Sequence, residues 1–190
     1  MPSLLSARPS LRLLLTSSLL LAACGGPPRS AAEAQIDGLP AYDAEAQARF
    51  DDSIDPVMVG LSLDKPIYRG DLRLRDRSQA ADFIVRAKLT TVTEERSEVS
   101  RSFVLLFKPT ERVGGKESAP DPVEVHVHDR TPSFGMIVNV KDKLRGRTAI
   151  VLGKRFKADG AARLHVVVLP DDPEVLEAVR ENIALEELKK

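Results

Sequence analysis

Period-two alternation of apolar and polar residues recurs between residues 82 and 169, and it restricts the possible folds more than any other feature of this chain. The clearest case is Val123–His128, in which three valines alternate with polar residues. Successive side chains of a β-strand point to opposite faces, so this pattern predicts a strand with one buried face and one exposed face. From alternation, and from the consecutive apolar residues of the last two segments, we predict five strands, at residues 82–93, 101–107, 123–128, 148–156 and 163–169.

The residues between these segments indicate how the strands begin and end. Pro109 lacks a backbone donor and predicts the end of the second strand. The uninterrupted apolar run Ala149–Leu152 is typical of a central strand. Asp159-Gly160 predicts a tight hairpin between the last two strands. Asp71–Arg77 is compatible with either a charged turn of helix or a loop.

A helix is predicted at the C-terminal end. Asp171 or Asp172 caps it, and Pro173 occupies the first turn, where a missing N–H costs nothing. The helix has an apolar stripe made of Val175, Leu176, Val179 and Ile183, which should pack against the strands. The last two leucines, Leu185 and Leu188, do not lie on that stripe. A shorter helix is predicted from the spacing of Ile137, Val140 and Leu144.

These elements predict a mainly β fold, namely a small five-stranded OB-like barrel or sandwich with a C-terminal α-helix. Two segments, Ala80–Leu89 and Gly146–Leu152, resemble strands of netrin-like, OB-type barrel domains. Members of that family that inhibit proteases rely on an N-terminal cysteine and on disulfides. The domain has neither, so protease inhibition does not carry over to it.

The N-terminal residues predict export from the cytoplasm. Arg8 and Arg12 precede the mostly apolar run Leu13–Ala23, which is long enough for a signal peptide and too short to span a bilayer. We therefore predict a signal peptide over residues 1–23.

The sequence Leu21-Ala22-Ala23-Cys24 resembles the lipobox of bacterial lipoproteins, and Cys24 is the only cysteine of the chain. The resemblance implies cleavage between Ala23 and Cys24 and attachment of palmitate-type acyl chains to Cys24. Gly25, rather than Asp, follows the cysteine, which favours the outer membrane over the inner membrane.

Residues 24–55 are predicted to form the lipidated cysteine and a flexible acidic tether, and residues 56–190 a globular β domain. The tether carries seven acidic and two basic residues and shows no β alternation. Ala41–Arg49 could instead form a short helix, because Ala, Glu and Gln favour one. Removal of residues 25–50 is expected to leave the stability of the domain nearly unchanged.

Composition and spacing restrict the function further. Equal numbers of acidic and basic residues and the absence of Trp argue against a nucleic-acid partner. His126 and His128 lie two residues apart and share one strand face, so they could bind one metal ion with His165 as a third ligand. The alternative is that His126 and His128 are two solvent-facing histidines.

Two weaker patterns remain. His128, Asp129 and Ser133 contain the residue types of a hydrolytic triad, but no nucleophile elbow accompanies them. A local basic cluster could contact an anion or a lipid headgroup, or it could simply be solvated; it comprises Lys141, Lys143, Arg145, Arg147, Lys154, Arg155 and Lys157.

The sequence therefore favours a lipid-anchored protein of the bacterial cell envelope with its domain in the periplasm or at the cell surface. Its predicted role is a non-enzymatic binding or assembly module, without a cofactor, that contacts the membrane through its lipid and has an envelope protein as partner. The alternative is a small-ligand or metal-binding accessory lipoprotein that uses His126 and His128. An enzyme has the least support, because no nucleophile and base with a defined spacing emerge.

Overall fold

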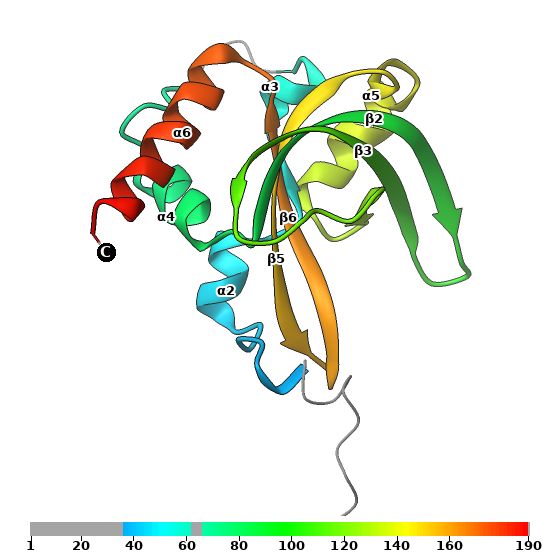
Figure 1. Cartoon of the computed structure of the whole chain (residues 1–190). Helices are drawn as coiled ribbons and strands as arrows, with labels where there is room; N and C mark the ends of the chain where they lie inside the picture. The colour runs from blue at the N-terminus through cyan, green and yellow to red at the C-terminus, as the bar shows by residue number, and fades with distance from the viewer. Residues whose placement is uncertain (1–35, 62–65, 190) are drawn as a thin grey trace, which may run out of the picture.

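The computed structural model describes residues 36–61 and 66–189, which form a mainly β structure around one curled six-stranded sheet (Figure 1). The strands are β1 (Ser53–Ile54), β2 (Phe83–Arg96), β3 (Arg101–Gly115), β4 (Val123–His128), β5 (Thr148–Ala158) and β6 (Ala161–Pro170). The helices are α2 (Ala44–Arg49), α3 (Pro56–Val59), α4 (Leu72–Ala80), α5 (Pro132–Leu144) and α6 (Pro173–Glu187).

The strand order in the sheet is β1-β6-β5-β2-β3-β4. β2, β3 and β4 follow one another as an antiparallel meander, and the chain then passes through α5 to β5, which pairs with β2. β6 returns antiparallel to β5, and the two-residue β1 pairs parallel to β6. β5 is thus an interior strand, as its apolar run predicts.

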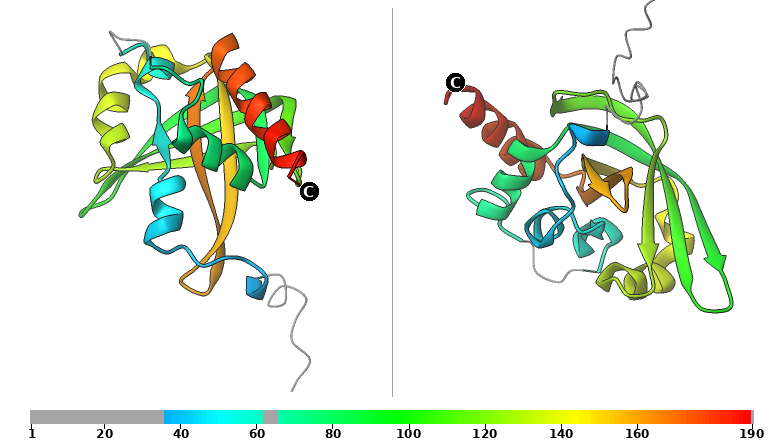
Figure 2. Two further views of the ribbon diagram at one scale, coloured as in Figure 1. Left: turned by 90° about the vertical axis from the view of Figure 1, so that its left-hand side faces the viewer. Right: turned by 90° about the horizontal axis from the view of Figure 1, so that it is seen from below.

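Each face of the curled sheet has its own apolar core. The inner core includes Phe103, Leu105 and Val125 and receives Ile137 and Leu144 from α5. The outer core includes residues of β5 and β6 and is covered by α4 and α6. Figure 2 (left) shows α5 and α6 on opposite sides of the sheet. Because both faces of β5 are covered, an uninterrupted apolar run suits this strand better than alternation does.

The five predicted strands correspond to β2–β6, and the barrel-like, mainly β class is confirmed in its general form. The number of strands differs, because Ser53–Ile54 adds a sixth strand in the described part of the chain. Two residues carry no detectable period, so sequence alone gives no signal for β1.

The predicted end of the second strand is wrong, because β3 continues through Pro109 to Gly115. Asp129 N–H donates to the carbonyl of Arg101 (3.1 Å), which places the backbone groups of odd-numbered β3 residues on the β4 side. β4 begins at Val123, which lies opposite Phe107, so it does not extend as far as Pro109. The side of Pro109 that lacks an N–H therefore faces no hydrogen-bonding residue of β4. A proline is tolerated in a strand at such a position.

The predicted helices and the hairpin are confirmed. Asp172 caps α6 by accepting from Glu174 N–H (2.9 Å), and Pro173 is the first helical residue. The uncertain segment at 71–77 is a helix, because Asp71 caps α4 through the N–H groups of Arg73 and Leu74. The hairpin turn has positive φ at Asp159 (50°) and Gly160 (76°), as a two-residue turn requires.

Gly153 on β5 makes room for a buried aromatic side chain of β2. A Cβ on Gly153 would collide with the ring of Phe83, which is fully buried on the neighbouring strand β2. Glycine at this position in β5 therefore leaves room for a large aromatic ring inside the curl.

Candidate functional site

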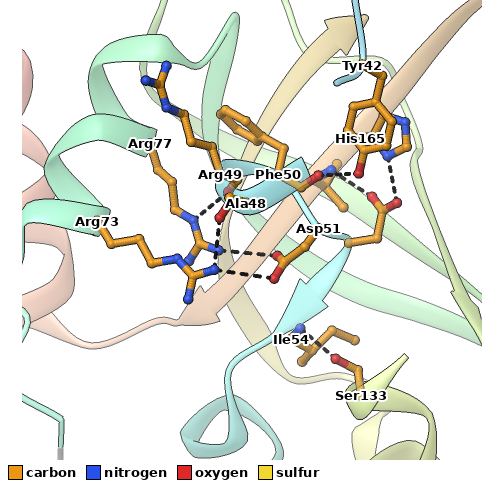
Figure 3. Close-up of polar contacts among 12 residues, drawn as sticks. Tyr42, Ala48, Arg49, Phe50, Asp51, Ile54, Arg73, Arg77, Ser133 and His165 are labelled. Atoms are coloured by element: carbon orange, nitrogen blue, oxygen red, sulfur yellow. Dashed lines mark hydrogen bonds and ion pairs between the residues drawn. The ribbon is translucent and has the colours of Figure 1, made fainter. Parts of the chain in front are cut away.

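Residues of the predicted tether form an aromatic and acidic cluster with the last strand, which we call the His165 cluster: Tyr42, Asp52 and His165. The His165 ring lies parallel to the Tyr42 ring, with centroids 3.6 Å apart. Its Nδ1 is 2.8 Å from Asp52 Oδ2, and the other oxygen of Asp52 accepts from Val166 N–H (2.9 Å). Figure 3 shows the stacked rings beside the start of β1.

Asp52 can reach both groups because its backbone has φ 53°, in the left-handed region. Asp tolerates this region better than most residues, but the conformation still carries a cost that the surrounding contacts must offset. Two hydrogen bonds from β6 to one carboxylate provide that compensation. The arrangement fixes the chain just before β1.

Tyr42 closes the other side of the cluster. Its hydroxyl donates to the carbonyl of Phe50 (2.6 Å), and burial, aided by Asp52 and Asp51, raises the pKa of Tyr42 to about 12. Phe50 itself is fully buried in the outer core, against Phe156. Tyr42 therefore connects the start of the segment to its end.

A second set of contacts, from α4, holds the same segment. Arg73 Nη2 donates to the carbonyl of Ala48 (2.8 Å), and Arg77 Nε donates to the carbonyl of Arg49 (2.6 Å). Arg77 Nη2 also pairs with Asp51 Oδ1 at 3.2 Å. These guanidinium groups satisfy carbonyls at the C-terminal end of α2, which have no partner within the helix (Figure 3).

Here the structure differs from the predicted flexible tether over residues 24–55. Residues 41–55 contain α2, as the alternative interpretation of Ala41–Arg49 allows, and β1. Phe50 and Ile54 belong to the cores. Some of the acidic side chains that suggested a solvated arm are instead paired with residues of the β domain. Asp51 pairs with Arg77, and Asp52 contacts His165. Residues 24–35 and Cys24 lie outside the described residues.

The His165 cluster contains an acid–base pair, but its geometry favours structure over catalysis. Asp52 accepts from Nδ1 and leaves Nε2 as the free nitrogen of the ring. Nε2 is buried and has no hydrogen-bond partner among the described residues. Within residues 36–61 and 66–189, no serine or threonine hydroxyl donates to it, so no nucleophile of that part of the chain is paired with this base.

The predicted metal ligands are not brought together. His126 and His128 lie on the exposed face of β4, with ring centroids 6.3 Å apart, whereas His165 lies on β6 near the opposite end of the strand order. No group of three or more His, Cys, Asp or Glu residues in the described ranges could hold a metal ion. His165 lies apart from the other two histidines, beside Asp52, and His126 contacts Glu124 (Nε2 to Oε1, 2.6 Å).

The residues of the possible hydrolytic triad do not form one. Ser133 is buried, and its hydroxyl accepts from Ile54 N–H at 3.0 Å. That bond caps the backbone of β1 from the start of α5. Ser133 is thus a structural group that links a helix to the edge of the sheet.

The predicted basic cluster is largely neutralised. Lys141 pairs with Glu94, Lys154 with Asp82 and Lys157 with Asp37. Arg155 is bonded to Glu117, and Arg147 donates to the carbonyl of Met58. Four of the seven cations are thus paired with carboxylates in the described structure, which favours a structural role for them.

One open groove of the described surface lies between Arg69 and one side of α6, lined by Pro173, Leu176, Glu177, Arg180, Glu181 and Ala184. It does not contain the histidines or the His165 cluster. Deep, mostly apolar sites with a few convergent polar groups are typical of small-ligand binding.

Comparisons with protein-family models, with curated proteins and with solved structures find no match to this chain. Within the described residues, no helix is long and apolar enough to cross a membrane. Sequence reasoning missed the His165 cluster because Tyr42, Asp52 and His165 are far apart in the chain. The one local signal was the tyrosine and phenylalanine in an otherwise polar segment, at Tyr42 and Phe50.

Proposed function

We propose that this protein is a lipoprotein of the bacterial cell envelope whose β domain is a non-enzymatic binding or assembly module. The observation that carries the proposal is the position of Cys24, the only thiol of the chain, directly after Leu21-Ala22-Ala23. Two or three acyl chains on this residue would anchor the protein stably, because each buried CH₂ contributes about 0.8 kcal/mol.

The geometry of the domain is compatible with a role near a membrane. Ala41 pairs with Lys157, so the chain enters the described structure beside the end of the β5–β6 hairpin (Figure 1). Twelve residues lie between Cys24 and Asp37, and the thirteen Cα-to-Cα steps that join the two can span at most about 45 Å. The hairpin end would therefore face the membrane, and the end that carries α3 would face away from it.

One feature of the structure and one of the sequence support a module that binds an envelope protein. The acid–base pair of Asp52 and His165 is used to hold the chain, and its free nitrogen is buried. The zero net charge of the chain favours a protein partner over nucleic acid. We infer a partner in the envelope, reached by diffusion of the anchored domain.

We also propose that the sheet is an OB-type barrel left open on one side. The supporting observation is the order of elements: a three-stranded meander, a helix, and a hairpin whose first strand returns to pair with the first strand of the meander. In a closed barrel of this type the last strand would pair with the third. Here β6 pairs with the short β1 instead.

The anchor is tested by replacing Cys24. The full chain and its Cys24→Ser variant are expressed in a Gram-negative host, and the mass of the N-terminal peptide is measured after membrane fractionation. We expect acyl mass on Cys24 in the outer-membrane fraction, and no acyl mass with uncleaved precursor or released protein for Cys24→Ser.

A matched control separates the lipobox from the mere presence of a thiol. The double variant Cys24→Ser/Ser30→Cys restores one thiol after Pro27-Pro28-Arg29. It should remain unacylated if the small residues before the cysteine direct modification. A mature wild-type protein without acyl mass on its first residue would refute the proposed anchor.

A further inference from the structure

The free edge of β4 has a defined set of unpaired backbone groups. Among the described strands β4 pairs with β3 alone, and Asp129 N–H donates to the carbonyl of Arg101 on that side. Backbone direction alternates along a strand, so Val123, Val125 and Val127 bond to β3. The N–H and C=O groups of Glu124 and His126 therefore point to the free edge.

The last residue of the strand is different. The carbonyl of His128 also points to this edge, but it already accepts from Thr131 N–H (2.9 Å) and from Thr131 Oγ1 (2.8 Å). The available groups are therefore those of Glu124 and His126, together with the N–H of His128.

The opposite edge of the sheet is protected, whereas β4 is not. β1 has two residues, Ile54 N–H is bonded to Ser133 Oγ, and α3 follows directly. β4 has six residues, and it contains no proline, lysine or register shift, the usual means by which proteins protect a free edge. An unprotected edge of this kind is suited to receive another strand.

The side chains of β4 indicate which strand would fit. Glu124 and His126 share the outer face, with side chains 52% and 48% exposed, and they contact each other along the strand (Oε1 to Nε2, 2.6 Å). A contact across the edge would therefore exchange this pair between the two copies. In an antiparallel pairing of two β4 strands centred on Val125, each Glu124 lies directly opposite the His126 of the other copy. A carboxylate opposite an imidazole N–H stabilises a cross-strand pair.

This register also uses the available backbone groups. Glu124 and His126 of each copy exchange both of their hydrogen bonds, which gives four bonds around the two-fold axis. A pairing centred on His126 would instead need the carbonyl of His128, which is occupied by Thr131. Backbone geometry and side-chain chemistry therefore both favour the register centred on Val125 over the one centred on His126.

We propose that two copies of this chain associate through antiparallel pairing of their β4 edges, centred on Val125, to form one continuous sheet. The interface is isologous, so the same residues of both copies supply donors and acceptors. This inference rests on β4 alone and does not depend on the lipid anchor.

The oligomeric state tests the proposal. The full chain carrying Cys24→Ser, in mild detergent, is examined by sedimentation equilibrium. We expect a reversible dimer, and we expect His126→Glu to raise the dissociation constant at least about 10-fold, because it places carboxylates opposite each other. The exchange Glu124→Lys/His126→Glu should restore association.

His128→Glu is the matched control, because it adds the same charge on the same face but lies outside the exchanged pairs. It should change the dissociation constant by less than about 3-fold. Circular dichroism and thermal unfolding of each variant establish that it is folded. A monomer at about 100 μM protein, or equal weakening by both histidine variants, would overturn the proposal.

Cysteine cross-linking tests the register itself. In the Cys24→Ser background, Glu124→Cys and His126→Cys are oxidised separately and as a mixture. Directly opposed residues lie within disulfide distance, so the mixture should give a covalent heterodimer, whereas each variant alone should give little. Efficient cross-linking of His126→Cys by itself would show a different register and contradict the pairing proposed here.

Discussion

Glu94 lies near the end of β2 and joins three elements. Its Oε1 accepts from Arg96 (2.8 Å) and from Arg101 on β3 (2.6 Å), and its Oε2 accepts from Lys141 on α5 (3.0 Å). The hydrogen bonds from Arg96, Arg101 and Lys141 lower the pKa of Glu94 to about 2. This carboxylate therefore connects the long β2–β3 hairpin to α5.

The lowered pKa predicts a pH-dependent contribution of Glu94 to stability. A folded pKa of about 2, below the ordinary value of 4.5, means that the contribution is present above about pH 4.5 and is lost as the pH falls toward 2. Wild type should be more stable than Glu94→Gln at pH 7, and the difference should shrink at acidic pH. Urea unfolding between pH 7 and pH 2.5 measures it.

Glu98 offers a control for this titration, because it is exposed in the loop between the same two strands. Glu98→Gln should leave the free energy of unfolding within about 0.5 kcal/mol of wild type at pH 7. A difference between wild type and Glu94→Gln that does not change with pH would contradict the role assigned to the Glu94 network.

At the scale of elements, α6 covers the outer core with one apolar face. Val175 and Val179 are fully buried, Ile183 is partly buried, and Leu185 and Leu188 are exposed, as their positions off the stripe predict. Gln79 of α4 donates to the carbonyl of Asn182 (3.2 Å), which fixes the two helices side by side. The helix therefore packs as part of the fold.

Val179→Asp is expected to be severely destabilising, because it buries a carboxylate without a partner. Val179→Ala should lower the free energy of unfolding by about 2 kcal/mol, at the low end for a buried aliphatic side chain. Urea unfolding of the full chain measures both. Leu185→Asp, on the exposed side of the same helix, should cost less than about 1 kcal/mol. A Val179→Asp protein as stable as wild type would show that α6 does not pack on the core.

At the scale of the whole molecule, residues 42–55 bind two separate parts of the domain. Arg73 and Arg77 donate hydrogen bonds to carbonyls at the end of α2. His165, a residue of β6, contacts the carboxylate of Asp52. Burial lowers the pKa of Arg77, and Asp51 offsets this effect in part. A chain leading from a membrane anchor would thus meet a rigid attachment point before it enters the sheet.

These contacts reverse the expected effect of removing the N-terminal arm. Deleting residues 25–50 should destabilise the domain, because Phe50 is fully buried and Tyr42 stacks on His165. Phe50→Ala alone should cost about 3–5 kcal/mol. Gln47→Ala, an exposed change on α2, should stay within about 0.5 kcal/mol of wild type. Urea unfolding compares them, and an unchanged midpoint for Phe50→Ala would mean that the segment does not contribute to the core.

The sequence alone determined the features that depend on local periodicity and local chemistry. Alternation identified β2, β3 and β4, and uninterrupted apolar runs identified β5 and β6. Asp172 with Pro173 marked the start of α6, and Asp159-Gly160 marked the hairpin turn. In each case the signal lies within a few consecutive residues, because side-chain direction, capping and turn geometry depend on neighbours in the chain.

Only the tertiary structure decided which distant residues meet. His165 alternates like any strand residue, and nothing near it indicates that Asp52 and Tyr42 will enclose it. β3 can likewise continue past Pro109 only because β4 begins opposite Phe107 and needs no hydrogen bond from the proline. The six acidic residues between Asp37 and Asp55 suggested a solvated arm, because net charge favours exposure. Asp51 and Asp52 are nevertheless held against the domain, because Arg77 pairs with Asp51 and His165 contacts Asp52. No property of the local sequence encodes such long-range pairing.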